Sequence, residues 1–312
     1  MSDRPVVRYE VTGRVARVTL DRPERGNAIT RQLIAELVAC VERADLDPAV
    51  HVLSLTGAGS GFCAGYDLVE SAERGGMQAA ADADATGPGA GAPAGSPLDP
   101  AVIGANHDPD ATWDPMVDYA MMGRNVRGFM SLFDCGKPVV CSVHGFCVAG
   151  GTDMALCSDL LLIAQDAKIG YPPARVWGSP TTALWAHRVG AQRAKRLLFT
   201  GDCLSGAEAL EWGLAIEAPA AEDLAQRTEI LIERIARVPV NQLMMMKLLV
   251  NQTVHAQGLH GSQLLGTVFD GIARHTVEGH AFRRRAGEAG FREAVRERDE
   301  PFGDLGRSTF KG

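Results

Sequence analysis

Two glycine-containing stretches carry the residue types of this sequence that are best suited to catalysis. The first is "GFCAGYDL" (Gly61–Leu68) and the second is "GFCVAGGTDMAL" (Gly145–Leu156). Each stretch follows an apolar run that predicts a buried strand, "VHVLSLTG" before the first and "KPVVCSVHG" before the second. If these strands are parallel neighbours, both loops leave the sheet at the edge where ligand sites of α/β folds collect.

The second stretch predicts a helix that begins at about Gly150 and exposes main-chain donors. The first N–H groups of a helix have no partner within the helix and carry a partial positive charge. The small residues of "AGG" leave these amides open to a ligand. One such donor from each loop would form an oxyanion hole, in which two N–H groups stabilise an oxygen that becomes negative.

Asp153 is the candidate acid or base of this site. It follows Gly150 by three residues, so on a helix its carboxylate lies on the same face as that amide. A carboxylate beside a polarised carbonyl can remove the adjacent proton or guide water to a conjugated double bond. The alternative is that Asp153 only complements the helix dipole as an acidic first-turn residue. The residues alone leave both interpretations open.

The elements around these loops alternate between strands and helices. Val6–Glu10 and Val15–Leu20 predict a hairpin, and Thr30 predicts the N-cap of a helix with apolar residues at helical spacing. A third buried strand is expected at "DLLLIAQ", and Ser205 with Glu208 has the spacing of a capping box before Gly213. This alternation predicts an α/β fold with a largely parallel sheet.

Two further regions differ in character from this core. Of the 22 residues from 79 to 100, 16 are Ala, Gly or Pro, which predicts a partly flexible insertion at about 72–112. A helix follows near Trp113, with a stripe that we expect in the core, from Met116 to Phe133. Beyond Pro239 only helices are expected, at 239–256, 259–275 and 281–298. We therefore divide the chain into a core of residues 1–236 and a helical region of residues 237–312.

Composition excludes several classes of protein. The net charge of −7 argues against a nucleic-acid surface, because binding a polyanion needs a dominant basic face. No apolar run reaches the length of a membrane span and the N-terminus lacks a signal-peptide pattern, so we expect a cytoplasmic protein without a membrane partner. The seven cysteines lack paired spacing and are expected as reduced core residues.

Four separated motifs together resemble the crotonase (enoyl-CoA hydratase/isomerase) superfamily. They are the two glycine-containing stretches, "SDLLLIAQDAKIGYPPARVWGSP" and "GDCLSGAEALEWGLA". The resemblance covers about Val6 to Ala236, and the tail is similar to the family's helical trimerisation region. It implies a spiral of repeated ββα units, an acyl-CoA thioester as ligand, and a homotrimer or hexamer. A dinucleotide-binding fold is disfavoured because no GxGxxG opens a helix after the first strand.

The resemblance also implies roles for individual residues. The main-chain amides of Tyr66 and Gly150 match the oxyanion donors, and Asp153 falls where family hydratases have their first catalytic Glu. The residues that match the coenzyme A contacts, with the phosphate-binding position first, are Arg25, Ala28, Ala64, Gly65, Asp67 and Leu68.

The family's second catalytic Glu is absent, because "GYPPARVWG" places Pro173 at its position. Asp153 would then act alone, or with help from Tyr171 or Asp67. The preferred activity is that of an enoyl-CoA hydratase, a lyase, with Asp153 as the sole acid/base. The alternatives are an isomerase or an acyl-CoA hydrolase of the same fold, or a catalytically weak acyl-CoA binding protein. We expect no metal site, since His and Cys never cluster at ligand spacing, and no cofactor beyond the coenzyme A of the substrate.

Overall fold

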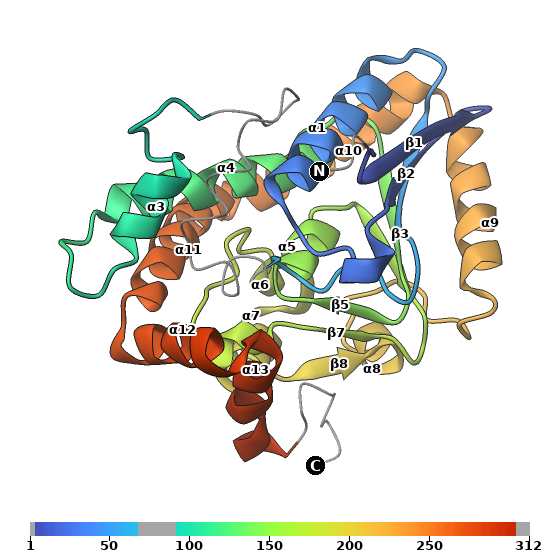
Figure 1. Ribbon diagram of the computed structural model, residues 1–312. Coiled ribbons are helices and arrows are strands. Elements are labelled where there is room, and N and C mark those ends of the chain that lie inside the picture. The colour runs from blue at the N-terminus through green and yellow to red at the C-terminus, as the bar shows by residue number, and fades with distance from the viewer. Residues whose placement is uncertain (1–3, 68–91, 304–312) are drawn as a thin grey trace.

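A computed structural model describes residues 4–67 and 92–303 of the chain (Figure 1). The predicted contact at Leu68 and most of the predicted insertion lie outside the described residues. The part of the insertion that is described contains α3 (Pro100–Asn106).

The core is a five-stranded sheet with the order β1-β2-β3-β4-β6. Only β1 is antiparallel to its neighbour, and the strands β2, β3, β4 and β6 run parallel to one another. A second sheet has the order β5-β7-β8. The bounds are β1 (Val7–Thr12), β2 (Val15–Leu20), β3 (Val52–Gly57), β4 (Val139–Val143), β5 (Phe146–Val148), β6 (Leu160–Ile163), β7 (Lys168–Gly170) and β8 (Cys203–Ser205). The parallel pairing of β3 with β4 confirms that both glycine-containing loops leave the same sheet edge.

Helices cover the large sheet on both sides. In Figure 1 the strands run between α9 (Leu224–Ala236) on one side and α1 (Arg31–Leu46) with α4 (Pro115–Asp134) on the other. The hydroxyl of Thr30 accepts a hydrogen bond from the amide of Leu33 at 3.2 Å, which confirms the predicted cap of α1. The predicted capping box of Ser205 and Glu208 is also present, at the start of α8 (Gly206–Glu211).

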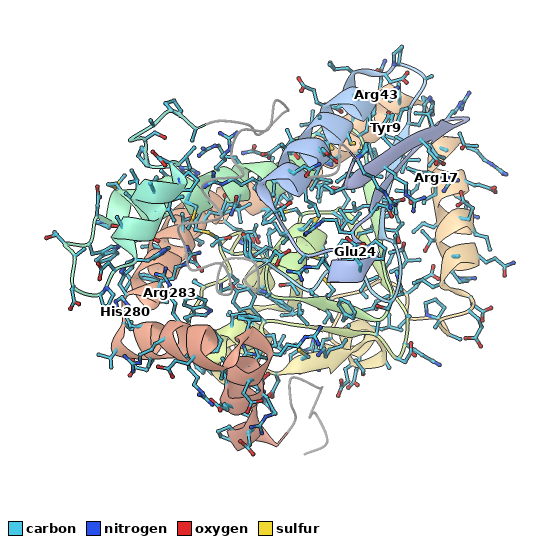
Figure 2. All side chains as sticks on the ribbon, in the orientation of Figure 1. Tyr9, Arg17, Glu24, Arg43, His280 and Arg283 are labelled. Atoms are coloured by element: carbon cyan, nitrogen blue, oxygen red, sulfur yellow. The ribbon has the colours of Figure 1, made fainter. Side chains whose placement is uncertain are left out.

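Charged side chains connect α1 to β1 and α9 to β2. The guanidinium of Arg43 lies 4.5 Å from the ring centroid of Tyr9, which joins α1 to β1 (Figure 2). On the other side Arg17 of β2 forms two hydrogen bonds with Glu229 of α9, at 2.5 and 2.8 Å. Since these side chains are partly exposed, each contact adds modestly to stability.

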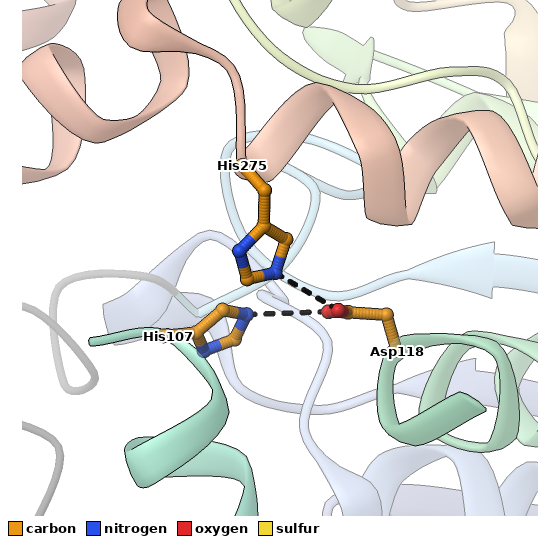
Figure 3. Close-up of side chains that lie close together, drawn as sticks. All are labelled: His107, Asp118 and His275. Atoms are coloured by element: carbon orange, nitrogen blue, oxygen red, sulfur yellow. Dashed lines mark hydrogen bonds and ion pairs between the residues drawn. The ribbon is translucent and has the colours of Figure 1, made fainter. Parts of the chain in front are cut away.

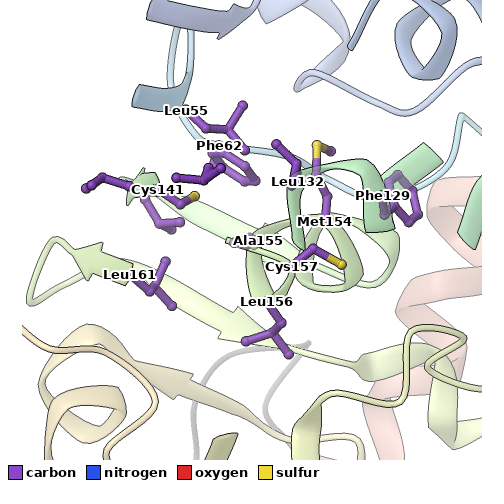
Figure 4. Close-up of a cluster of buried hydrophobic side chains, with 14 of the residues drawn as sticks. Leu55, Phe62, Phe129, Leu132, Cys141, Met154, Ala155, Leu156, Cys157 and Leu161 are labelled. Carbon is purple, nitrogen blue, oxygen red and sulfur yellow. The ribbon is translucent and has the colours of Figure 1, made fainter. Parts of the chain in front are cut away.

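The short helix α5 (Gly150–Leu156) lies entirely within the hydrophobic core. Figure 4 shows its residues Met154 and Leu156 among Phe62, Leu132 and other buried side chains. All seven cysteines are buried, which agrees with the prediction that they are core residues. Because α5 is held by the core on every side, the residues of its first turn are rigidly positioned.

Helices α6 (Trp185–Val189) and α7 (Ala191–Thr200) follow β7, and the C-terminal region is helical as expected. It contains α10 (Val240–Ala256), α11 (Leu259–Arg274), α12 (Val277–Ala289) and α13 (Phe291–Asp299). None of the helices within residues 4–67 and 92–303 combines the length and apolar character needed to cross a membrane.

Two details of the helix predictions were wrong. The single helix expected at 281–298 is two helices, because Gly290 adopts a φ of 87° that ends α12. Met116 was expected in the core but is 58% exposed; it lies in the first turn of α4, whose buried residues begin at Val117.

Candidate active site

The two glycine-containing loops are joined along their main chains. Cys63 and Cys147 form a parallel bridge, and the amide of Val148 donates to the carbonyl of Cys63 at 3.0 Å. The amide of Phe62 also donates to the carbonyl of Phe146 at 2.9 Å. The sequence reasoning placed both loops at one edge, and the structure brings them into direct contact.

A second bridge orients the amide of Tyr66. Ile29 pairs with Tyr66 in a parallel bridge, in which the amide of Ile29 donates to Gly65 at 2.8 Å and the amide of Asp67 donates to Ile29 at 3.1 Å. In such a bridge Ile29 forms its hydrogen bonds with the two residues that flank Tyr66, so the N–H of Tyr66 itself points away from Ile29.

The backbone of the first loop passes beside the first amide of α5. Gly65 has a φ of +93°, and a Cβ at that position would lie 2.8 Å from the Cβ of Ala149 and 3.5 Å from the main-chain nitrogen of Gly150. Only glycine fits this close approach without displacing the loop. Within the described residues, no hydrogen bond uses the main-chain N–H of Tyr66 or Gly150.

Ala149 holds a strained backbone conformation just before α5. Its φ of 53° and ψ of −129° lie outside the regions that alanine normally adopts. Hydrogen bonds fix it on both sides, from its own amide to Gly170 at 3.1 Å and from the amide of Thr152 to its carbonyl at 2.9 Å. Strain of this kind costs about 1–3 kcal/mol and is concentrated at functional sites. Here it sets the direction of the Gly150 amide.

Asp153 is a buried carboxyl with one oxygen that is not hydrogen bonded. It is 1% exposed, and its Oδ1 accepts from the hydroxyl and the amide of Thr182 at 2.7 and 3.2 Å. No hydrogen-bond partner of Oδ2 is present among the described residues. Burial raises the pKa of Asp153 to about 7 although the hydrogen bonds from Thr182 oppose this. A carboxyl that titrates near neutrality can donate and accept protons at physiological pH.

The ring of Tyr66 lies over Gly150. Two ring carbons would be 2.7 and 3.1 Å from a Cβ placed on Gly150, so a larger residue there would displace the ring. The Tyr66 hydroxyl is buried, and within the described part of the chain it has no hydrogen-bond partner. Burial and the nearby charges of Asp153 and Asp270 hold the pKa of Tyr66 well above its usual value. Tyr66 therefore remains neutral.

This geometry agrees with the comparisons to known proteins. The model of the enoyl-CoA hydratase/isomerase family matches residues 10–87 and 115–289. The chain belongs to this family. A crystal structure of an enoyl-CoA hydratase from Mycobacterium smegmatis is 57% identical, with 97% of each chain covered and a TM-score of 0.88. The protein EchA13 of Mycobacterium tuberculosis is 32% identical over 263 residues, which cover 81% of this chain and 75% of that protein. The 1,2-epoxyphenylacetyl-CoA isomerase of Escherichia coli is 29% identical over 245 residues, 76% of this chain and 78% of that one.

The matches confirm the crotonase-type α/β fold with a C-terminal helical region and an enzyme of the hydratase/isomerase family. The family model leaves residues 88–114 unmatched, and these overlap the insertion predicted at about 72–112. The boundaries of that insertion and of the two predicted regions stay predictions.

The described positions that match the family's coenzyme A contacts are held together by hydrogen bonds; Arg25 and Ala64 are exposed, whereas Ala28 and Gly65 are buried. The amide of Ala64 donates to Gly26 at 2.9 Å, and the amide of Ala28 donates to Arg25 at 3.2 Å. Asp67 accepts from both Arg25 and Arg22 at 3.1 Å. These bonds tie the segment around Arg25 to the first glycine-containing loop, which fits a loop-fixing role for Asp67.

The segment around Pro173, where the family has its second glutamate, contains no carboxylate side chain. Pro173 lies in a short 3-10 helix (Pro172–Arg175). The hydroxyl of Tyr171 donates to the carbonyl of Ser179 at 2.8 Å, so its proton is already engaged. Of the two helpers considered from the sequence, Tyr171 is thus hydrogen bonded elsewhere, and Asp67 is paired with arginines.

Sequence reasoning missed the contribution of α11 to the site. The buried face of this helix carries Gln263, Asp270 and Arg274, and Gln263 donates to the carbonyl of Thr182 at 3.2 Å. Asp270 is 5% exposed and forms an ion pair with Arg274. The spacing of seven and then four residues between these polar positions, which places them on one face of a helix, was the available signal. The C-terminal region was expected to serve subunit contacts. It also contacts Thr182, the hydrogen-bond partner of Asp153.

Arg274 also lies close to a second buried carboxylate, that of Asp118. Figure 3 shows its two oxygens facing His107 and His275, at 3.3 and 2.9 Å from their Nε2 atoms. Trp113 also donates to Asp118, at 2.9 Å. Burial raises the pKa of Asp118, but the hydrogen bonds from His107 and Trp113 and the charge of Arg274 outweigh it and bring the pKa to about 2.

Three such side chains could in principle hold a metal ion. Here Asn106 donates to Asp118 as well, at 3.0 Å, and Arg274 adds a positive charge at 3.7 Å. Donors already surround both carboxylate oxygens, and the guanidinium disfavours a dication. We interpret the cluster as a hydrogen-bonded hub, and the expectation of no metal site stays a prediction.

Proposed function

We propose that the protein adds water to the double bond of a 2-enoyl-CoA thioester. The observation that carries this proposal is the buried carboxyl of Asp153, which follows Gly150 by three residues in α5 and whose Oδ2 has no hydrogen-bond partner among the described residues. A buried polar atom without a partner is unusual in a folded protein and is expected to meet a ligand or water.

In the proposed reaction the thioester oxygen accepts hydrogen bonds from the amides of Tyr66 and Gly150. Addition of water to the β-carbon moves electrons onto this oxygen, and the two donors stabilise the resulting negative charge. The carboxyl of Asp153 then delivers its proton to the α-carbon. A pKa near 7 leaves a large protonated fraction of Asp153 for this step at neutral pH.

The coenzyme A portion of the substrate would lie along the surface of the first loop. Arg25 is partly exposed, and a guanidinium suits a phosphate group. The proposed contacts also include Ala28, Ala64, Gly65 and Asp67, and we propose that no cofactor other than the coenzyme A of the substrate takes part.

A second candidate is double-bond isomerisation at the same site. It is favoured by Pro173, because an isomerase can move a proton with one carboxylate, and by the similarity to the Escherichia coli isomerase. A hydrolase or a weakly active acyl-CoA binding protein would use the same oxyanion donors.

The test is incubation of the protein with crotonyl-CoA while the absorbance of the conjugated enoyl thioester is followed. We expect that absorbance to fall with the wild type, and the rate to fall at least about 100-fold with Asp153→Asn. The matched control is Asp223→Asn, an exposed aspartate that makes no capping hydrogen bond at α9. Tight binding of crotonyl-CoA without turnover would contradict the proposal.

A further inference from the structure

The hydration proposed above needs two proton-transfer groups, and only one has been placed. One group must take a proton from the attacking water while another gives a proton to carbon. Family hydratases carry the second carboxylate at the position of Pro173, which has no side-chain donor or acceptor. The structure offers one other buried carboxylate close to that position.

Asp270 of α11 lies near the segment that carries Pro173. A Cβ placed on Gly178 would lie 3.3 Å from the Cβ of Pro173 and 3.7 Å from Oδ1 of Asp270. It would also lie 3.5 Å from the hydroxyl oxygen of Tyr171. The carboxylate of Asp270 and the side chain of Pro173 therefore border the same small space, although the two residues are 97 positions apart in the sequence.

The contacts of Asp270 hold it and leave capacity for a water molecule. Its Oδ2 pairs with the guanidinium of Arg274, while its Oδ1 accepts one long hydrogen bond of 3.3 Å from the amide of Ser179. A carboxylate oxygen has two acceptor positions, so Oδ1 can accept a second hydrogen bond. Arg274 is in turn held 3.7 Å from Asp118, in the hub of Figure 3.

The groups that face Asp270 come from five segments, which are its own helix α11, α4, α5, the first glycine-containing loop and the stretch from Tyr171 to Ser179. Arg274 lies on its own helix and favours its charged form, as does the Ser179 amide; burial and Asp118 of α4 oppose this, and the pKa of Asp270 is raised. Asp153 of α5 is close enough that the Asp270 charge helps to raise the pKa of Asp153. Tyr66 and Tyr171 face it as neutral rings. The two carboxyls differ in that only Asp270 has a cationic partner.

We propose that Asp270 acts as the second acid/base of the reaction, deprotonating the attacking water while Asp153 protonates the α-carbon. This inference rests on the proposed function. The water oxygen bonds to the β-carbon as Oδ1 of Asp270 accepts one proton of the water. The electron pair of the double bond moves into the thioester enolate, and the α-carbon then takes the proton of Asp153. The proton on Asp270 passes to Asp153 through water, which restores the starting state.

The experiment separates the two proton transfers. Water addition to crotonyl-CoA needs both carboxyls, whereas exchange of the α-protons of butanoyl-CoA with deuterated water needs only Asp153 and the oxyanion donors. For Asp270→Asn we expect hydration to fall by about 10²–10⁴-fold. We expect α-proton exchange, measured by mass spectrometry, to stay within about 3-fold of wild type, and Asp153→Asn to lose both reactions.

Two results would overturn the role of Asp270 while leaving the proposed function intact. One is an Asp270→Asn variant that hydrates within about 3-fold of wild type. The other is an equal loss of hydration and of α-proton exchange in Asp270→Asn, with exchange not recovered in Asp270→Glu, which indicates a structural role. A wild-type protein that exchanges α-protons but never hydrates would instead overturn the proposed function itself. Asp223→Asn again serves as the matched control.

Discussion

The buried carboxyl that is proposed to serve catalysis, Asp153, also makes the stability of the protein depend on pH. Its folded-state pKa of about 7 lies above the value of an unfolded aspartate, so the folded state binds the proton more tightly. The folded state is therefore favoured at low pH, and this contribution is lost as the pH rises from about 4 through about 7. The buried carboxylate form of Asp153 thus destabilises the protein at neutral and alkaline pH.

Replacing Asp153 with Asn should therefore stabilise the protein. The amide keeps an acceptor for Thr182 and removes the buried charge, so we expect the free energy of unfolding to rise by roughly 2–4 kcal/mol at pH 8 and by much less at pH 5. Denaturant titrations of both proteins at the two pH values measure this difference. An equal effect at both pH values, or a loss of stability at pH 8, would show that the carboxyl is not strained by burial.

The pH dependence of activity follows from the same group. Because Asp153 is proposed to donate a proton, kcat/KM for hydration should decline above about pH 7, as the protonated fraction falls. Thr182→Val removes a hydrogen bond that favours the carboxylate, so the decline should move to higher pH. A pH–rate profile of each protein tests this, and an unchanged profile in the variant would contradict the assignment.

At the residue scale the sequence predicted Asp153 as a candidate acid or base but did not predict what surrounds it. The helical position of Asp153 after "AGG" is local information. Thr182 lies 29 residues further along and Asp270 lies on another helix, and their approach to Asp153 depends on tertiary packing. The chemistry of a site is thus easier to predict from one segment than the contacts that tune it.

At the scale of elements, the close approach of the first loop to α5 is the feature that positions the two amides. Gly65→Ala should displace the loop, since the added Cβ would meet Ala149 at 2.8 Å. We expect kcat/KM to fall by about 10²–10³-fold, the effect of losing one oxyanion donor.

The control for that substitution is Gly213→Ala. Gly213 also has a positive φ, of +76°, but an added Cβ meets nothing within 4 Å. It should cost about 1–2 kcal/mol of stability through backbone strain while activity is retained. Equal losses of activity in both variants would indicate a general effect of strain.

The Asp118 hub connects α4 with the end of α11 and the segment at His107. Burial lowers the pKa values of His107 and His275, and hydrogen bonds lower that of Asp118. For all three groups the unfolded state binds protons first as the pH falls, so the hub loses stability below about pH 6.5 and further below about pH 4.

Asp118→Asn should remove the part of this loss that occurs below pH 4. In the wild type that part amounts to about 2 kcal/mol, from a pKa of about 2 against the usual value near 4. Urea unfolding at several pH values between 2.5 and 7 measures both curves. A variant curve parallel to the wild type below pH 4 would contradict the role of Asp118.

Most elements follow from local patterns, whereas one exception has a local cause and another depends on tertiary packing. The cap at Thr30 and the capping box at Ser205 were predicted because each lies within four residues of its partner. The break at Gly290 was missed because mixed charges continue at helical spacing on both sides. The buried face of α11 was not assigned to the site, because helical spacing does not reveal which neighbouring element a face will contact.

At the scale of the whole molecule, α10 and α11 expose an apolar surface. The exposed residues are Met245, Met246, Leu248, Leu249, Val250, Leu264, Leu265, Phe269 and Ile272. A patch of this kind marks an interaction site more often than open surface. The inward face of α11 is polar and its outward face is apolar, which is the reverse of a helix on a free surface.

We propose that this surface joins the subunits of a homotrimer, or of a hexamer built from trimers. Light scattering after size exclusion should give the mass of three or six chains. Leu249→Glu together with Phe269→Glu should shift the protein to monomers, because buried charges without partners oppose association. A monomeric wild type at micromolar concentration would contradict the proposal.

The most direct test of the account is a crystal structure with a bound acyl-CoA thioester. We expect the thioester oxygen to lie within about 3.1 Å of the main-chain nitrogens of both Tyr66 and Gly150. Oδ2 of Asp153 should face the α-carbon. A thioester oxygen that contacts neither amide, or only one of them, would contradict the central claim.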